Sequence, residues 1–174
     1  MKKLLGILSV CLFLINCNKE EDCCVLPPSV NYSFEAATAQ GCSDFYVYKE
    51  LPEERLHLSV SGKRSDLGLN LTAQTFDVNA PSLKIQIHLF KDEIGNYACD
   101  DVANDQGEIS TTWTAISGAV TIQITEDSIS VDPWGTTFKM TVKLKDMVLE
   151  NEEKEVANLP EEIFEDVFVG WLPG

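Results

Sequence analysis

The sequence contains few of the side chains on which most enzyme active sites depend. Among its 174 residues there are only two histidines, His57 and His88, and no Gly-x-Ser-x-Gly, His-Glu-x-x-His or glycine-rich phosphate-binding motif. Both histidines are expected on the polar faces of strands, where cross-strand pairing at the surface explains them without catalysis. The 28 acidic residues could include a pair suited to hydrolysis, but the distances between them cannot be read from the sequence.

The chain is also poor in basic residues and in long apolar runs. It has 13 Lys and Arg against 28 Asp and Glu, a formal net charge of −15, which argues against nucleic acid as a partner because phosphates need basic side chains. The apolar run from Leu4 to Ile15 is shorter than the ~20 residues that a membrane-spanning helix needs. Any stable attachment to a membrane must therefore be made in another way.

The N-terminal residues are typical of a secretory signal, with the basic Met1–Lys3 before the apolar run. That run ends in Leu14-Ile15-Asn16-Cys17, which resembles the bacterial lipobox, in which the cysteine is acylated and becomes the first residue of the mature protein. The resemblance implies a lipoprotein signal peptide over residues 1–16 and a lipid anchor on Cys17. An ordinary signal peptide with an incidental cysteine is the alternative.

Three charged residues lie close after the predicted anchor, separated from it by Asn18. Lys19, Glu20 and Glu21 resemble the lipoprotein export signal of Bacteroidota, which directs lipoproteins to the outer face of the outer membrane. The alternative is a solvated tether on a protein that faces the periplasm, since charged residues also make extended linkers. We expect residues 17–30 to form a lipidated tether, and we expect the protein to be lipid-anchored in the outer membrane at the cell surface.

Five cysteines remain after the predicted cleavage, and an oxidising compartment permits disulfides among them. Cys23-Cys24 lacks the C-x-x-C spacing of zinc knuckles and neither histidine lies near a cysteine, so no metal site and no cofactor are predicted. Cys42 and Cys99 each adjoin the end of a predicted strand, where their Cα atoms could approach within bonding range. We predict a Cys42–Cys99 disulfide and leave the partners of Cys23 and Cys24 open.

The segment of residues 31–174 is dense in β-strand patterns. Apolar and polar residues alternate with a period of two in several runs separated by turn clusters, and no long helical period occurs. The runs are Leu56–Ser61, Leu83–Phe90, Val120–Thr125 and Lys139–Lys145, with an aromatic run at Phe45–Tyr48. The acidic residues 150–165 are expected to form a turn or a single helical turn before a last strand at 167–171. The prediction is an all-β fold, a single antiparallel β-sandwich domain, with a barrel as the related possibility.

Several segments together resemble a known group of proteins. They are Gly95-Asn96-Tyr97, Ser117–Ile122, the run Phe138–Leu149 and the closing Phe168-Val169-Gly170-Trp171. In these the chain is similar to small uncharacterised surface lipoproteins of Bacteroidota with immunoglobulin-like or related β-sandwich domains. The resemblance implies a fold and a location, and it implies no activity.

Two further features are candidate sites, and a third is weighed and set aside. Asp127-Ser128-Ile129 resembles the O-glycosylation acceptor of Bacteroidota, which would place a glycan on Ser128. Trp134, between Pro133 and Gly135 in a turn, is a possible ligand platform, whereas Trp113 and Trp171 are expected in the core. The oxygen-rich residues 100–108 fail the EF-hand pattern and are better explained as a solvated loop.

These observations predict a lipid-anchored cell-envelope protein that meets the membrane through its anchor. Its β-sandwich is expected to be a non-catalytic binding or structural module, for a glycan or for another envelope protein. The alternative is a carboxylate-dependent hydrolase that acts on envelope or dietary glycan.

Overall fold

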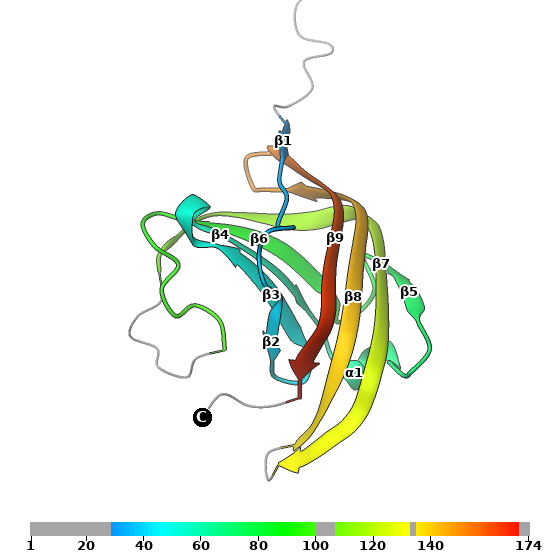
Figure 1. Cartoon of the computed structure of the whole chain (residues 1–174). Coiled ribbons are helices and arrows are strands. Elements are labelled where there is room, and N and C mark those ends of the chain that lie inside the picture. Colours follow the sequence, from blue (N-terminus) through cyan, green and yellow to red (C-terminus); the bar gives the residue numbers. More distant parts are fainter. Residues whose placement is uncertain (1–28, 100–106, 133–134, 171–174) are drawn as a thin grey trace, which may run out of the picture.

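A computed structural model describes residues 29–99, 107–132 and 135–170, and at 128–132 and 135 it describes only the backbone. The strands are β1 (Ser29–Asn31), β2 (Gln40–Cys42), β3 (Tyr46–Leu51), β4 (Leu56–Ser61), β5 (Gln74–Asp77), β6 (Lys84–Phe90), β7 (Ile109–Asp132), β8 (Gly135–Glu150) and β9 (Val156–Val169). Two short helical turns, η1 (Pro52–Glu54) and α1 (Arg64–Leu67), complete the described elements (Figure 1). The predicted all-β fold is confirmed. No helix in these ranges has the length and apolar character needed to cross a membrane.

The strands form one sheet in the order β1-β9-β8-β7-β6-β4-β3-β2, with β5 paired to β7. All neighbours are antiparallel except β1, which runs parallel to β9. The long strands bend, and the sheet curls until β2 and β3 contact β9 (Figure 1). The predicted packing of two separate sheets in a sandwich is therefore not confirmed, because the strands share a single curled sheet around the core.

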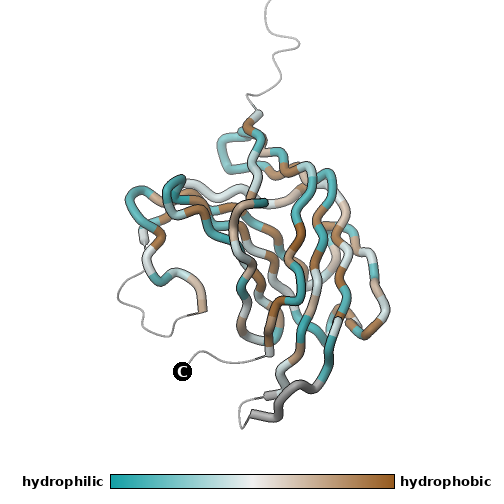
Figure 2. The backbone as a smooth tube through the Cα atoms, viewed as in Figure 1, coloured by the Kyte–Doolittle hydropathy of each residue, from teal (hydrophilic) through white to brown (hydrophobic). Residues whose placement is uncertain are grey.

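The period-two alternation explains why these segments form strands and which face they bury. The inward residues of the central strands are almost wholly buried, among them Leu58, Ile87, Ile122 and Leu144, each with no exposed surface. The alternation of polar and apolar residues along the strands is visible in Figure 2. Full burial stabilises each such side chain by about 1.5–3 kcal/mol relative to exposure.

The acidic stretch at 150–165 differs from the prediction. It holds a tight turn, in which Asn151 Oδ1 accepts from the Glu155 N–H at 2.8 Å, and most of it then belongs to β9. The prediction of a turn over this whole stretch was wrong, because its acidic residues lie mainly on the solvent face of a strand whose other face buries Ala157, Leu159 and Phe164. At the other end, β1 begins at Ser29, so the domain starts within the predicted tether.

The curled sheet closes where β2 and β3 approach β9, a line of contact that we call the seam. Beyond one end of the seam, where β1 pairs with β9, the Tyr32 N–H donates to the Asn158 carbonyl at 2.9 Å. At the other end, the Gly170 N–H donates to the Ser43 carbonyl at 2.7 Å. Between them Gly41 packs so closely that a Cβ atom there would lie 2.7 Å from a methyl carbon of Val167 and equally close to one of Val169. Only glycine fits this approach.

Candidate functional site

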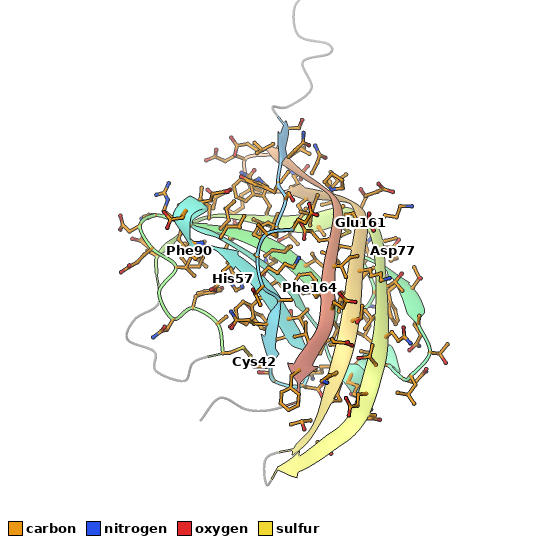
Figure 3. The ribbon with its side chains drawn as sticks, viewed as in Figure 1. Cys42, His57, Asp77, Phe90, Glu161 and Phe164 are labelled. Atoms are coloured by element: carbon orange, nitrogen blue, oxygen red, sulfur yellow. A yellow bond between two sulfur atoms is a disulfide. The ribbon has the colours of Figure 1, made fainter. Side chains whose placement is uncertain are left out.

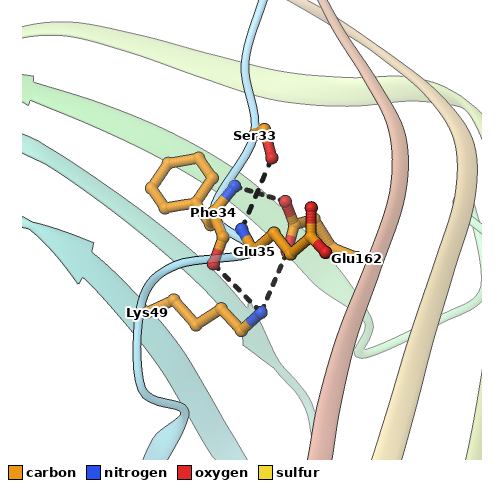
Figure 4. Close-up of polar contacts among 5 residues, drawn as sticks. All are labelled: Ser33, Phe34, Glu35, Lys49 and Glu162. Atoms are coloured by element: carbon orange, nitrogen blue, oxygen red, sulfur yellow. Dashed lines mark hydrogen bonds and ion pairs between the residues drawn. The ribbon is translucent and has the colours of Figure 1, made fainter.

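A buried ion pair occupies the middle of the seam (Figure 4). Lys49 on β3 and Glu162 on β9 are 5% and 2% exposed, and their Nζ and Oε2 atoms lie 2.9 Å apart. The backbone of Phe34 joins both charges: its N–H donates to Glu162 Oε1, and its carbonyl accepts from Lys49 at 3.2 Å. A depression of about 430 Å³ lies beside the pair, lined by Ser33, Glu35, Lys49, Glu161, Glu162 and Ile163. Because the two charges satisfy one another and the crossing backbone, we interpret them as structural.

The loop after β6 lies over the outer face of the sheet. Phe90 and Ile94 are buried there, outside the main core, and Cys99 bonds to Cys42 at the end of β2. The Cα atoms of the two cysteines are 5.8 Å apart, so the predicted disulfide is confirmed. Figure 3 shows His57 and Phe90 on the side of the sheet that this loop covers.

Beneath the loop lies a group of aromatic rings that we call the tyrosine–histidine cluster, which consists of Tyr46, Tyr48, His57, His88 and Tyr97. His57 and His88 are cross-strand partners, but they are only 0% and 7% exposed, so the predicted position at the surface is wrong. The Tyr97 ring packs edge-on against both, with centroid distances of 5.0 and 5.5 Å. The alternation indicated that each histidine lies on the polar face of its strand, but a loop without periodicity gives no sign that it will cover that face.

Within the cluster, three side chains form a hydrogen-bonded chain that we call the relay. Glu50 Oε1 lies 2.9 Å from His57 Nδ1, and His57 Nε2 lies 2.9 Å from the Tyr46 hydroxyl. A neutral imidazole that donates its Nδ1–H to the carboxylate has an Nε2 that accepts the phenolic hydrogen. Burial raises the pKa of Tyr46, so the phenol keeps its proton and acts as the donor. His57 Nε2 is therefore placed to accept a proton from the Tyr46 hydroxyl.

A second, larger depression of about 640 Å³ lies beside the cluster. It is lined by Gln86, Ile109, Ser110, Thr111, Thr112, Thr114, Glu150, Asn151, Glu152 and Glu153, from β6, β7 and the turn after β8. Two of its hydroxyls are held by hydrogen bonds: His88 Nδ1 lies 2.8 Å from Thr112 Oγ1, and Gln86 Nε2 donates to Thr114 Oγ1 at 3.2 Å. We call this feature the polar depression.

His88 supports that wall as a neutral ring. Burial first, and then the nearby His57 and Lys84, lower the pKa of His88 to about 4. A neutral imidazole can either accept from or donate to the Thr112 hydroxyl. At neutral pH the contact between cluster and depression is thus a hydrogen bond without a buried charge.

Most residues singled out in the sequence lie outside the part of the chain that the structure describes. Cys17, Lys19, Glu20, Glu21, Trp134 and Trp171 fall outside the described residues, as do Cys23, Cys24 and most of the oxygen-rich loop at 100–108. Ser128 lies in β7, where only the backbone is described. Trp113 is 5% exposed and packs edge-on against Tyr32 at 5.7 Å, so its predicted core position is confirmed.

The polar depression was not predicted, although one signal was present. The run Ser110-Thr111-Thr112 followed by Thr114 places hydroxyls in a strand where apolar residues would alternate with polar ones. In the part of the chain that the structure describes, no group of three or more His, Cys, Asp or Glu side chains is arranged to hold a metal ion. Comparisons with protein-family models, curated proteins and solved structures found no match.

Proposed function

We propose that this chain is a lipid-anchored protein of the outer membrane surface whose β domain binds a polar, hydroxyl-rich ligand, such as a glycan, without catalysis. The polar depression carries the proposal, because it is a concave surface on which several hydroxyl, amide and carboxylate groups converge, as the recognition of a hydroxyl-rich ligand requires. The lipobox-like Cys17 and the charged Lys19, Glu20 and Glu21 support the location.

The chemistry of the lining favours a neutral ligand. Hydroxyl, amide and carboxylate oxygens accept hydrogen bonds from ligand hydroxyls, while Gln86 and Asn151 add amide donors. The lining residues include three glutamates and neither Lys nor Arg, which disfavours anionic groups such as uronates or phosphates. The lining also contains no aromatic ring on which a sugar could stack, so we expect weak binding to a single sugar and stronger binding to an oligosaccharide.

A titration with neutral oligosaccharides tests the proposal. Soluble malto-, xylo- and mannohexaose would be added separately to the ¹⁵N-labelled protein, and amide shifts would be followed by NMR. At least one should shift residues 110–114 and 150–153 in a saturable manner. Appearance of shorter sugars in the same samples would favour the hydrolase alternative.

Substitutions locate the response. Thr114→Val and Gln86→Ala should weaken the saturable binding, since each removes a polar group from the lining. Thr75→Val is the matched control, because the Thr75 hydroxyl faces Thr121 at 3.0 Å on β5 and β7, and neither residue lines the depression. Shifts that are absent with all three sugars, or equal in Thr114→Val and the unaltered protein, would contradict the proposal.

A further inference from the structure

The tyrosine–histidine cluster concentrates side chains that the rest of the chain nearly lacks. It contains both histidines and three of the four tyrosines of the sequence. The side chains come from β3, β4, β6 and the loop after β6. The proposed ligand site uses only the contact of His88 with Thr112, so the relay through His57 is left without a role in it.

The relay has the geometry of a path for one proton. The Tyr46 hydroxyl and His57 Nε2 are 2.9 Å apart, which is within hydrogen-bond range for direct transfer. His57 has no exposed surface, so water does not compete for this contact. On its far side, Nδ1 faces the Glu50 carboxylate, whose side chain is 23% exposed and would stabilise an imidazolium. The phenol, imidazole and carboxylate thus form a proton donor, an acceptor and a stabilising charge.

The surroundings do not favour chemistry on a bound substrate. Neither of the two depressions is lined by Tyr46 or His57. A nucleophile or general acid must come within about 3 Å of the reacting atom. Removal of an electron carries no such requirement, because an electron can pass through packed protein to an acceptor outside. A buried phenol with an internal base suits electron loss better than group transfer.

We propose that Tyr46 is a redox-active tyrosine that loses an electron to one-electron oxidants while His57 takes its proton. The reacting partners are oxygen-centred radicals and oxidised metal complexes. Tyr46 gives one electron to the oxidant, which is reduced by one electron, and its O–H proton moves to His57 Nε2. The products are a neutral tyrosyl radical and an imidazolium paired with Glu50. A one-electron donor that reduces the radical lets the proton return to the phenol.

Each member of the relay makes a distinct contribution. Burial that raises the pKa of Tyr46 opposes loss of its proton to water, so oxidation depends on the internal base. The Glu50 carboxylate, with Oε1 2.9 Å from His57 Nδ1, is placed to form an ion pair with the imidazolium that the transfer produces. Tyr48 and Tyr97 lie next in line: the Tyr48 ring is 5.8 Å from the Tyr46 ring, and Tyr97 packs on His57 and is partly exposed. They connect the site to the surface.

Flash oxidation of the whole protein tests the assignment. A photo-excited ruthenium tris-bipyridyl complex with persulfate supplies the oxidant, and the tyrosyl radical is followed by transient absorption and by electron paramagnetic resonance. Tyr46→Phe should remove the fastest phase of radical formation. His57→Gln should slow that phase by about 100-fold, the low end of what a positioned base contributes. Tyr32→Phe is the matched control, because Tyr32 packs on Trp113 away from the cluster, and it should leave the fast phase unchanged.

Two outcomes would overturn the assignment: a fast phase retained in Tyr46→Phe, or an unchanged rate in His57→Gln. Near-ultraviolet circular dichroism and an intact disulfide establish that each variant is folded. If His57→Gln does not fold, Glu50→Gln decides the question, because Glu50 is partly exposed and its amide keeps the hydrogen-bonding shape. A slower fast phase in Glu50→Gln supports the relay, and a rate equal to that of the unaltered protein rejects it.

Discussion

Lys49 Nζ and Glu162 Oε2 lie 2.9 Å apart, on strands that are not hydrogen-bonded neighbours, with almost no exposed surface on either side chain. The ion pair joins β3 to β9 across the seam, where these two strands do not pair through backbone hydrogen bonds. Removal of one member would leave the other charge buried without its partner, which is costly in a region of low dielectric.

Glu162→Leu should therefore lower the free energy of unfolding by about 3–5 kcal/mol, the usual cost of breaking a buried pair. It also removes the acceptor for the Phe34 N–H. Urea unfolding followed by tryptophan fluorescence measures the change. Glu126→Leu is the control, because Glu126 and its partner Lys139 have side chains that are 55% and 41% exposed. Loss of this ion pair should cost at most about 1 kcal/mol. An equal loss of unfolding free energy in the two variants would show that breaking the buried pair costs no more than breaking the exposed one.

The disulfide gives a second prediction. It closes a loop with a sequence separation of 57, for which the chain-entropy model gives about 4 kcal/mol of stabilisation. The double variant Cys42→Ser, Cys99→Ser should lose up to that amount in chemical denaturation. Peptide mapping of the unreduced protein is the independent check, and recovery of Cys42 or Cys99 linked to Cys23 or Cys24 would contradict the pairing.

The stability of the domain should depend on pH through His88. Burial lowers the folded-state pKa of His88 to about 4, below the ~6.5 of an unfolded chain. The unfolded state therefore binds more protons between these values, so the contribution is fully present above pH ~6.5 and is lost as pH falls towards 4. The loss amounts to roughly 3 kcal/mol at most.

The comparison with His88→Gln isolates this effect from the many carboxylates that also titrate in acid. The variant should show a shallower fall in unfolding free energy between pH 6.5 and 4 than the unaltered protein. Proton NMR of the His88 ring reports the pKa directly, and a value near 6.5 would refute the prediction.

The anchor is tested by Cys17→Ala. If Cys17 carries the lipid, the variant should incorporate no acyl label and should leave the detergent phase on phase separation. Cys23→Ala is the matched control, as it removes a neighbouring cysteine and should retain the label. Acylation of Cys17→Ala would exclude the lipobox interpretation.

The export signal predicts a separate phenotype. Replacement of Lys19, Glu20 and Glu21 by Ala should leave acylation intact and remove the protein from the cell surface. Protease treatment of intact cells measures this, with lysed cells as the control for intrinsic cleavage. Unchanged accessibility on intact cells would show that the three residues are only part of a tether.

The strands with one solvent-exposed face were predictable, because a period of two indicates which residues of a strand are buried. Leu58 on β4 and Leu144 on β8 are examples. β9 was not predictable in the same way. The inward-facing residues of β9 are apolar except for Glu162, whose partner Lys49 is 113 residues away. In the sequence a glutamate at such a position predicts a solvent-exposed face, because its buried partner is not known. Alternation also indicates which side chains of a strand are buried, but it does not indicate which strands are neighbours. The same pattern is therefore expected for one curled sheet and for two packed sheets.

The candidate sites depended even more on distant contacts. Cys42 and Cys99 could be paired because both adjoin strand ends, which is local information. The relay could not be inferred, since it requires the register that sets Glu50 opposite His57 and the loop that covers them. The polar depression likewise combines residues near 112 with others near 152, and only the pairing of β7 with β8 brings them together.

The position of β1 against β9 has a consequence for the order in which the domain can form. The first described strand pairs with the last, and Phe34 bonds to a residue 128 positions later. During synthesis the N-terminal strand emerges long before its partner exists, and contacts of such sequence separation are slow to form. The seam can therefore close only after β9 has been made, so a chain that ends before residue 156 cannot reach the final fold.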